Sequence, residues 1–506
     1  MSSPLIVVFV HGWSVTDTET YGGLPVRVRN EAKAHGLDID VQQIFLSQYL
    51  SFHDEVALAD VSRAFDTALH DAIPSLTSNG HRIACITHST GGPVVRDWWQ
   101  RLYASQDRRC PMSHLIMLAP ANFGSSLAQL GKGRLSRIKA AFSGVEPGQG
   151  ILDWLELGSP EAWALNSDWI DNGQQALRKG GMFPFVMTGQ TIDRKFYDHL
   201  NAYTGESGSD GVVRVAAANL NARRIELTQA TPPKTLTKKV LKTYQPLELT
   251  EVSSAPQTAM RIVSEASHSG SDLGIMRSVY RPAGHHRGRE VTDAILRCLA
   301  VQTKADYDKL VTQLADETTS VQQHERLEIE KKLLRRDVTF IHDRYSMVIF
   351  RVTDDYGHAI SDFDLILTAG KDNDPNHLPR GFFMDRQQNK RFKNTITYYF
   401  NYDVMAGSPA LTGPDGHVVR RALAGASALG FRIQPRPDDG FVRYLPCQIK
   451  ADQTLLRHTL APNATTLIDI RLRRIVDDNV FRLRKMQGDN VDGSFKRVRP
   501  SRRIVD

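Results

Sequence analysis

Short apolar runs recur along roughly the first 300 residues, and amphipathic stretches separate them. The run at residues 5–10 has no polar interruption, which is typical of a strand buried on both faces of a sheet. Residues 56–73 carry apolar side chains with helical periodicity, which indicates a helix with one buried face. Further strands are predicted at 39–45, 82–86, 114–118 and 182–188, and further helices at 24–34, 93–99 and 291–301. This alternation predicts a doubly wound, mostly parallel sheet with helices on both faces.

From residue 338 onward, the pattern changes to short strands with alternating apolar and polar positions. In one of them Ile468, Ile470 and Leu472 alternate with charged residues, and similar runs occur at 347–352, 363–367 and 395–402. Such strands, separated by turn residues, predict an antiparallel β-sandwich. We therefore expect a first domain at 1–301, a charged helical connector at 302–337, a sandwich-like domain at 338–475 and a basic tail at 476–506. The Lys-, Pro- and Thr-rich residues 228–260 are expected to form a mobile excursion from the first domain.

Composition fits a soluble protein of two or more domains, because 506 residues are too many for one compact core. The net charge of +7 suits an anionic surface and does not require nucleic acid. The four cysteines are scattered without metal-ligand spacing, which favours a reduced compartment without disulfide bonds. No apolar run is long enough to span a membrane, and residues 5–10 lack the basic flank of a signal peptide. We therefore expect a cytoplasmic location in the producing cell.

A candidate nucleophile follows the strand at 82–86. The sequence continues as THSTGG at residues 87–92, and a helix begins beyond it. A serine held between a strand and a helix by small residues is the layout of a nucleophile elbow, which makes Ser89 the candidate. Thr87 occupies the position of the first glycine in the usual motif. The alternative is an ordinary strand-turn-helix connection.

Two later loops supply candidates for an acid and a base. Asp210 lies in the Gly- and Ser-rich turn GESGSDGVV, whose backbone is free to bend so that a carboxylate can reach a histidine. His268 lies between small residues in SEASHSG, as expected for a loop histidine that reaches back to the serine. The alternatives are Asp193 and Asp198 for the acid, and His285 and His286 for the base.

The segments VVFVHGW, THSTGG and APANFGS, in this order, resemble the α/β-hydrolase serine lipases, especially those similar to GPI-inositol deacylases. The resemblance covers roughly the first 300 residues and implies an α/β-hydrolase fold with Ser, Asp and His in that chain order. Similar lipases carry the acid in an SDGVV-type turn and the base in an HSG-type loop, which favours Asp210 and His268. The resemblance also implies an oxyanion hole formed by the backbone N–H groups of Trp13 and Thr90. This chemistry requires neither a metal ion nor an organic cofactor.

A long insertion at about residues 122–180 bears on the substrate. It contains Trp154, Trp163 and Trp169, and we expect it to form an apolar lid that covers Ser89 in water and swings onto lipid. The alternative is a helical pair with a modest buried face. With the basic charge and the resemblance, the insertion predicts a lipase or phospholipase that acts on membrane lipids.

A two-domain lipase without a leader also resembles the phospholipase effectors that bacteria inject through type VI secretion. This resemblance implies a lipid surface as substrate, a cognate immunity protein, an adaptor of the secretion apparatus, and no nucleic acid. Two other functions remain open. The first is a cytosolic carboxylesterase or amidase for small substrates, which would not prefer micelles over soluble esters. The second is a protein-interaction module on a hydrolase scaffold, with the β-rich domain as its working part.

Overall fold

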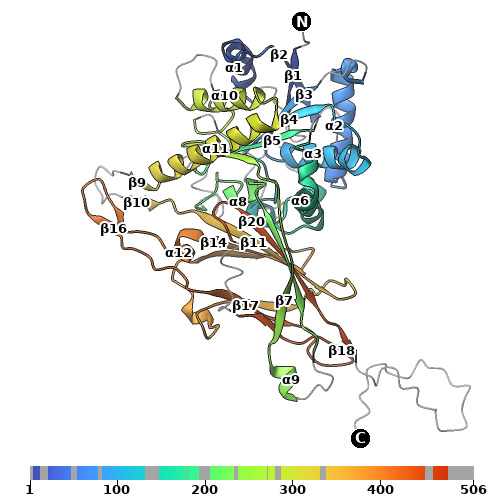
Figure 1. Cartoon of the computed structure of the whole chain (residues 1–506), viewed down its shortest axis with the longest axis vertical. Coiled ribbons are helices and arrows are strands. Elements are labelled where there is room, and N and C mark those ends of the chain that lie inside the picture. The colour runs from blue at the N-terminus through green and yellow to red at the C-terminus, as the bar shows by residue number, and fades with distance from the viewer. Residues whose placement is uncertain are drawn as a thin grey trace, which may run out of the picture.

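The computed structural model describes residues 4–11, 21–46, 54–77, 82–130, 148–178, 181–192, 206–232, 238–270, 272–279, 286–330, 338–450 and 460–476. The described residues form two large sheets, one above the other in Figure 1, and three two-stranded ones, and most helices lie around the upper large sheet. The basic tail beyond Val476 lies outside the described residues. In the described part of the chain, no helix is both long enough and apolar enough to cross a membrane.

The first sheet has six parallel strands in the order β2-β1-β3-β4-β5-β8. They are β1 (Leu5–His11), β2 (Ile39–Phe45), β3 (Ile83–His88), β4 (Met112–Leu118), β5 (Phe183–Thr188) and β8 (Ala259–Ile262). In β1, Val7 and Phe9 face one core while Val8 and Val10 face another, which explains the uninterrupted apolar run.

Helices cover both faces of this sheet. The helices on one face are α1 (Leu24–Glu31), α10 (His286–Leu299) and α11 (Lys304–His324). Those on the other face are α2 (Leu58–Ala72) and α3 (Gly91–Leu102). The expected connector is therefore a helix of the first domain, because α11 packs Tyr307, Leu310 and Leu314 into the core beside the sheet.

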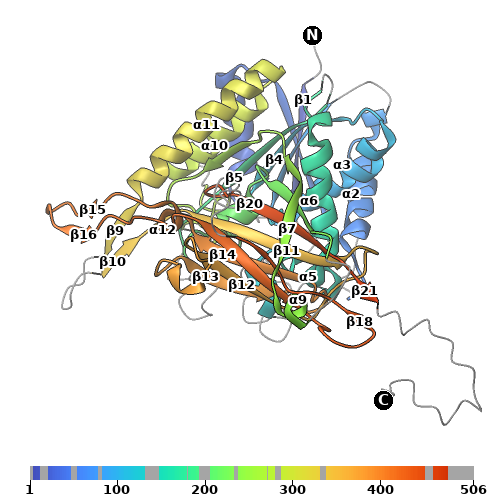
Figure 2. The same ribbon diagram turned by 60° about the horizontal axis from the view of Figure 1, so that its bottom comes forward.

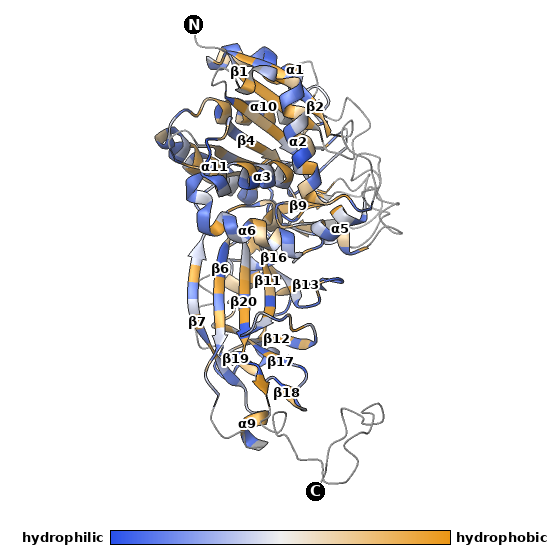
Figure 3. Ribbon diagram, turned by 90° about the vertical axis from the view of Figure 1, so that its right-hand side faces the viewer, coloured by the Kyte–Doolittle hydropathy of each residue, from blue (hydrophilic) through white to orange (hydrophobic). Residues whose placement is uncertain are grey.

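The second sheet has nine strands in the order β12-β17-β19-β7-β6-β20-β11-β14-β13. They are β6 (Arg223–Gln229), β7 (Gln245–Ser254), β11 (Tyr345–Asp354), β12 (Phe363–Ala369), β13 (Phe383–Gln388), β14 (Thr395–Asn401), β17 (Leu429–Pro435), β19 (Cys447–Ile449) and β20 (Thr465–Leu472). The sheet curls around its own apolar core, and apolar and polar residues alternate along strands such as β6 (Figure 3). The predicted fold class, an α/β-hydrolase with a second β-rich domain, is confirmed. The β-rich part is one mixed sheet, because β20 runs parallel to both β6 and β11 and β19 runs parallel to β7.

Shorter elements complete the chain. They are α5 (Gln149–Leu155), α6 (Pro160–Asn172), α8 (Val215–Ala218), α9 (Lys238–Lys242), α12 (Tyr402–Ala406), β9 (Leu327–Glu330), β10 (Val338–Ile341), β15 (Leu411–Thr412), β16 (Val418–Arg420), β18 (Val442–Arg443) and β21 (Ile475–Val476). Single 3-10 turns lie at Ala32–His35, Pro74–Thr77, Ala104–Gln106, Ser126–Leu130, Gly173–Gln175 and Pro375–His377.

The structure differs from the expectation of a mobile excursion at 228–260. Most of the described residues in this stretch lie in β6, α9, β7 and β8, and β7 pairs with β6 in the middle of the second sheet. Of the ten residues of β7, only Leu247 is buried. The strand is therefore held by its backbone pairing with β6, and its residues lack the apolar pattern that would predict a strand.

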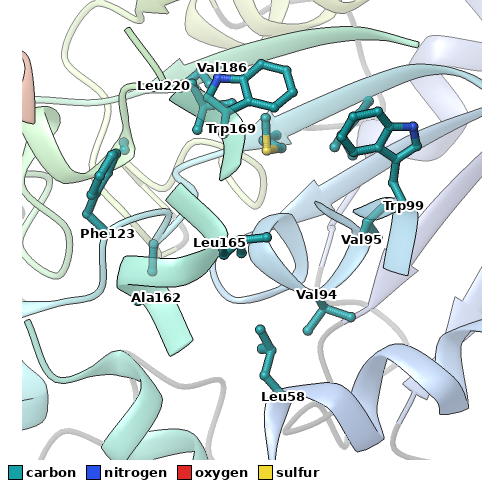
Figure 4. Close-up of a cluster of buried hydrophobic side chains, with 14 of the residues drawn as sticks. Leu58, Val94, Val95, Trp99, Phe123, Ala162, Leu165, Trp169, Val186 and Leu220 are labelled. Atoms are coloured by element: carbon teal, nitrogen blue, oxygen red, sulfur yellow. The ribbon is translucent and has the colours of Figure 1, made fainter. Parts of the chain in front are cut away.

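The described parts of the insertion are residues 122–130 and 148–178, and the tryptophans in the second part are not exposed. Trp154, Trp163 and Trp169 are 3%, 4% and 3% exposed. Figure 4 shows Trp169 of α6 in a buried cluster with Trp99 of α3, Val186 of β5 and Leu220. Helix α6 lies between α3 and the second sheet (Figure 2), where the Arg351 guanidinium stacks over the Trp163 ring. These tryptophans bury their apolar surface in the core that the first domain shares with the second sheet, so this surface is not exposed.

Candidate active site

Ser89 lies in the turn between β3 and α3 and has a φ of +53°, a left-handed conformation that few non-glycine residues adopt. Its N–H donates to the Leu118 carbonyl of β4 at 3.0 Å, which ties the turn to the neighbouring strand. A strained residue between a strand and a helix is the geometry of a nucleophile elbow. The side chain of Ser89 is thereby presented at the end of β3, beside the N-terminus of α3.

The two glycines after Ser89 allow the close packing that this turn needs. A Cβ atom at Gly92 would lie 2.9 Å from Pro120 Cβ and 3.3 Å from Met117 Cγ, so no other residue fits without displacement. A Cβ atom at Gly91 would lie 3.3 Å from Thr87 Cβ. Glycine at position 91 therefore leaves room for the Thr87 side chain. Thr87 stands where the usual motif has its first glycine.

Asp210 is completely buried in a turn that directs one carboxylate oxygen away from the backbone. Its Oδ1 accepts hydrogen bonds from the N–H groups of Val212 at 3.0 Å and Val213 at 2.8 Å. These bonds fix the carboxylate rotamer. The other oxygen, Oδ2, is left for a partner outside the turn.

That partner is His268, which is also completely buried. Its Nδ1 lies 2.9 Å from Asp210 Oδ2 and its Nε2 lies 3.1 Å from Ser89 Oγ. The carboxylate requires a proton on Nδ1, which leaves Nε2 as the acceptor for the Ser89 hydroxyl. The backbone N–H of His268 also donates to the Asp210 carbonyl at 2.9 Å, so the acid and the base are joined through backbone and side chain. This arrangement can withdraw a proton from Ser89 and prepare it for nucleophilic attack.

His88 is a site residue that the sequence analysis missed. Its Nε2–H donates to the His268 carbonyl at 3.0 Å, and the two imidazole rings are 4.7 Å apart. Burial and the neighbouring His268 hold the pKa of His88 well below 6.5, so this ring is neutral beside the base. It is one of 17 histidines, and its only distinguishing signal is its place immediately before Ser89.

The structure describes only some of the predicted oxyanion donors and alternative site residues. Thr90 is the N-cap of α3 and is 7% exposed, so its N–H belongs to the positive end of that helix. The alternative base His286 is the first residue of α10. Trp13, Asp193, Asp198 and His285 lie outside the described residues. Among the described residues, no group of three or more His, Cys, Asp or Glu side chains is placed to hold a metal ion.

The chain was compared with known proteins. Neither the protein-family models nor the curated proteins gave a match. Among solved structures, phospholipase PlaB from Legionella pneumophila is 41% identical, with 96% of this chain and 97% of that chain covered and a TM-score of 0.83. The structure of the same phospholipase in complex with thio-NAD gives 40% identity, the same coverage of 96% and 97%, and a TM-score of 0.79.

Proposed function

The chain belongs to the family of phospholipase PlaB, and on that premise we propose that it hydrolyses the carboxylic esters of membrane phospholipids with Ser89 as the nucleophile. One observation carries the proposal, namely the continuous hydrogen-bonded series from Asp210 through His268 to Ser89. The identity extends over nearly the whole of both chains, so it includes the second domain as well as the hydrolase sheet.

The proposed reaction has two halves. Ser89 Oγ attacks the ester carbonyl while His268 Nε2 takes the hydroxyl proton, and Asp210 stabilises the imidazolium that forms. His268 then gives the proton to the leaving alcohol, a lysophospholipid, and the fatty acyl group remains on Ser89 as an ester. Water enters, loses a proton to His268 and attacks the acyl-enzyme. Ser89 recovers its proton from His268, and the free fatty acid departs.

The tetrahedral oxyanion needs hydrogen-bond donors. We assign this role to the backbone N–H of Thr90, because it follows the nucleophile at the positive end of α3. The backbone N–H of Trp13 is the second proposed donor, because Trp13 follows two residues after β1, which ends at His11 and pairs with β3. Each donor in comparable sites stabilises the transition state by about 3 kcal/mol.

The proposal also specifies a class of lipid and a route of delivery. A phospholipid is favoured over a small soluble ester because the solved relative at 41% identity is itself a phospholipase. Delivery by type VI secretion, with a cognate immunity protein, rests on the sequence resemblance alone. A search for a gene encoding such a protein beside this one tests that part.

Activity on two substrates tests the proposal. The wild-type chain is expected to release labelled fatty acid from phosphatidylcholine or phosphatidylglycerol vesicles at a higher kcat/KM than it hydrolyses a short soluble ester. Ser89→Ala is expected to abolish both activities and leave the thermal unfolding temperature unchanged, because only one oxygen atom is removed. Hydrolysis of the soluble ester without hydrolysis of vesicles would favour the carboxylesterase alternative. Unchanged turnover in Ser89→Ala would show that the nucleophile is another residue.

A further inference from the structure

The turn that carries Asp210 lies where the two domains meet, because it leads directly into α8, next to β11 and β20 (Figure 1). Within the turn, Asp210 N–H donates to the Val213 carbonyl at 3.1 Å, and Ser209 pairs with Arg214 as an isolated bridge. The turn is therefore closed at its base by Arg214. Contacts that fix the position of Arg214 therefore also fix the position of the Asp210 carboxylate.

Side chains from both domains hold Arg214, which is 1% exposed. Its Nε and Nη2 donate to the Glu206 carboxylate at 2.8 and 2.7 Å, and Nη2 also donates to Asp385 of β13. Its guanidinium lies 4.2 Å from the centre of the Tyr399 ring of β14. Burial opposes the charge, but Glu206 raises the pKa of Arg214 above its usual value, so the cation persists. The two carboxylates and the aromatic ring together hold the Arg214 guanidinium in one position.

The second sheet also contacts the turn on its N-terminal side. The Tyr399 hydroxyl lies 3.0 Å from the carbonyl oxygens of both Ser207 and Gly208. Tyr345 of β11 stacks on the Tyr399 ring with centroids 5.0 Å apart. Gly208 has a φ of +74°, and a Cβ atom there would overlap the Tyr345 ring and the Tyr399 hydroxyl. The backbone two residues before Asp210 is therefore pressed directly onto the second sheet.

The chain beyond the turn is fixed to the same sheet. The Thr465 hydroxyl at the start of β20 donates to the Ala216 carbonyl at 2.7 Å. The Asn219 side-chain amide donates to the Asn463 carbonyl at 2.7 Å. The second sheet thus contacts the backbone before and after Asp210, and none of these contacts involves Ser89 or His268.

We propose that the second sheet positions the acid of the active site, and that Tyr399, Arg214 and Asp385 are positioning residues for Asp210. This inference rests on the proposed function of Ser89, Asp210 and His268. Asp210 has one carboxylate oxygen for His268, and a displacement of about 1 Å in such a group costs on the order of 100-fold in rate. Loosening these contacts is therefore expected to lower kcat and to leave KM unchanged.

Tyr399→Phe tests the inference, with Tyr398→Phe as the matched control. Both tyrosines lie in β14 and both hydroxyls bond to backbone carbonyls, but Tyr398 bonds to Leu365 at 2.6 Å within the core of the second sheet. The two variants lose the same kind of buried hydrogen bond. Tyr399→Phe is expected to lower kcat on phospholipid vesicles about tenfold with KM unchanged, whereas Tyr398→Phe stays within about twofold of the wild type.

Titration of Ser89 with a soluble fluorophosphonate separates positioning from a loss of folded protein, because it counts the folded active sites. Per titrated site, kcat is expected to remain about tenfold lower in Tyr399→Phe and to stay within about twofold of the wild type in Tyr398→Phe. If Tyr399→Phe fails to fold, Asp385→Asn replaces it, with Asp364→Asn of the exposed Arg436 ion pair as its control.

Equal kcat values per titrated site for Tyr399→Phe and Tyr398→Phe would overturn the inference. Equal kcat values for Asp385→Asn and Asp364→Asn would also overturn it. A wild-type chain without activity on vesicles would count against the proposed function instead. In that case the rate of Ser89 phosphonylation by a soluble fluorophosphonate gives the same comparison, and a slower reaction in Tyr399→Phe than in Tyr398→Phe is the expected result.

Discussion

The two adjacent histidines of the site are expected to carry different charges during turnover. His268 becomes an imidazolium when it takes the Ser89 proton, and its ring centre is 4.7 Å from that of His88. A second cation at that distance would oppose this step. Burial keeps His88 neutral, and its Nε2–H is used to hold the His268 carbonyl. His88 thus fixes the loop of the base without opposing its charge.

Substitutions of His88 test this role at the residue scale. His88→Phe removes the hydrogen bond to the His268 carbonyl, whereas the amide of His88→Gln retains a donor. We expect His88→Phe to lower kcat/KM by about tenfold, because a lost hydrogen bond of this kind is worth about 1 kcal/mol and the base is displaced as well. His88→Gln should retain more activity than His88→Phe, measured on the same soluble ester. Equal rates for the wild type and both variants would exclude the role.

His114 predicts how stability depends on pH. Burial lowers its pKa to about 4, and its Nε2–H donates to the Val301 carbonyl at 2.8 Å. In the unfolded chain a histidine has a pKa of about 6.5, so the unfolded state binds more protons at pH values between about 4 and 6.5. The free energy of unfolding therefore falls as the pH is lowered through this window. In urea titrations at pH 7 and pH 5, His114→Gln should lose less stability on acidification than the wild type. An identical loss in both proteins would contradict this assignment.

At the scale of elements, the sequence predicted local features well and long-range partners poorly. The strands β1 to β5 and the turn at Ser89 follow from apolar runs and small residues that lie within a few positions of one another. Strand β7 was missed because its partners are β6 and β19, and β19 lies about 200 residues further along the chain. The sequence correctly indicated that the tryptophans of α5 and α6 are shielded from water. The sequence alone could not tell whether lipid or the second sheet shields them.

Leu155 distinguishes a core segment from a lid. It is 1% exposed at the end of α5, whereas Leu249 on β7 is 46% exposed. Leu155→Ser is expected to lower the free energy of unfolding by about 2–5 kcal/mol, and Leu249→Ser by no more than about 0.5 kcal/mol. Because the segment is core, any loss of activity in Leu155→Ser should be equal on vesicles and on a soluble ester. A loss of activity on vesicles alone, with the free energy of unfolding unchanged, would support the hypothesis that this segment is a lid.

At the scale of the whole molecule, the two domains are built from interleaved parts of the chain. Strands β6 and β7 belong to the second sheet but precede β8 of the first sheet along the chain. The core around α2, α3 and α6 continues into Tyr345, Met347, Ile349 and Tyr399 of the second sheet. Each sheet therefore shares one core with the other, in addition to the core that it buries alone, and the shared core extends to the turn of Asp210.

A truncated chain tests this interdependence. A protein that ends at residue 330 keeps β6 and β7 but lacks their neighbours β20 and β19. We expect it to aggregate or to remain unfolded by circular dichroism, because unpaired strand edges and the uncovered core face would meet water. The full chain is expected to unfold in one cooperative calorimetric transition. A soluble truncated protein with the activity of the full chain would show that the first domain is independent.

The acyl-enzyme is the species that tests the central claim most directly. The purified chain is mixed with phospholipid vesicles, quenched with acid within the first turnovers and digested, and the peptide that contains Ser89 is examined by mass spectrometry. The account predicts a fatty acyl mass on Ser89 that matches the lipid supplied and is absent from Ser89→Ala. Fatty acid release by the wild type with the acyl group on another residue, or equal release by Ser89→Ala, would contradict it.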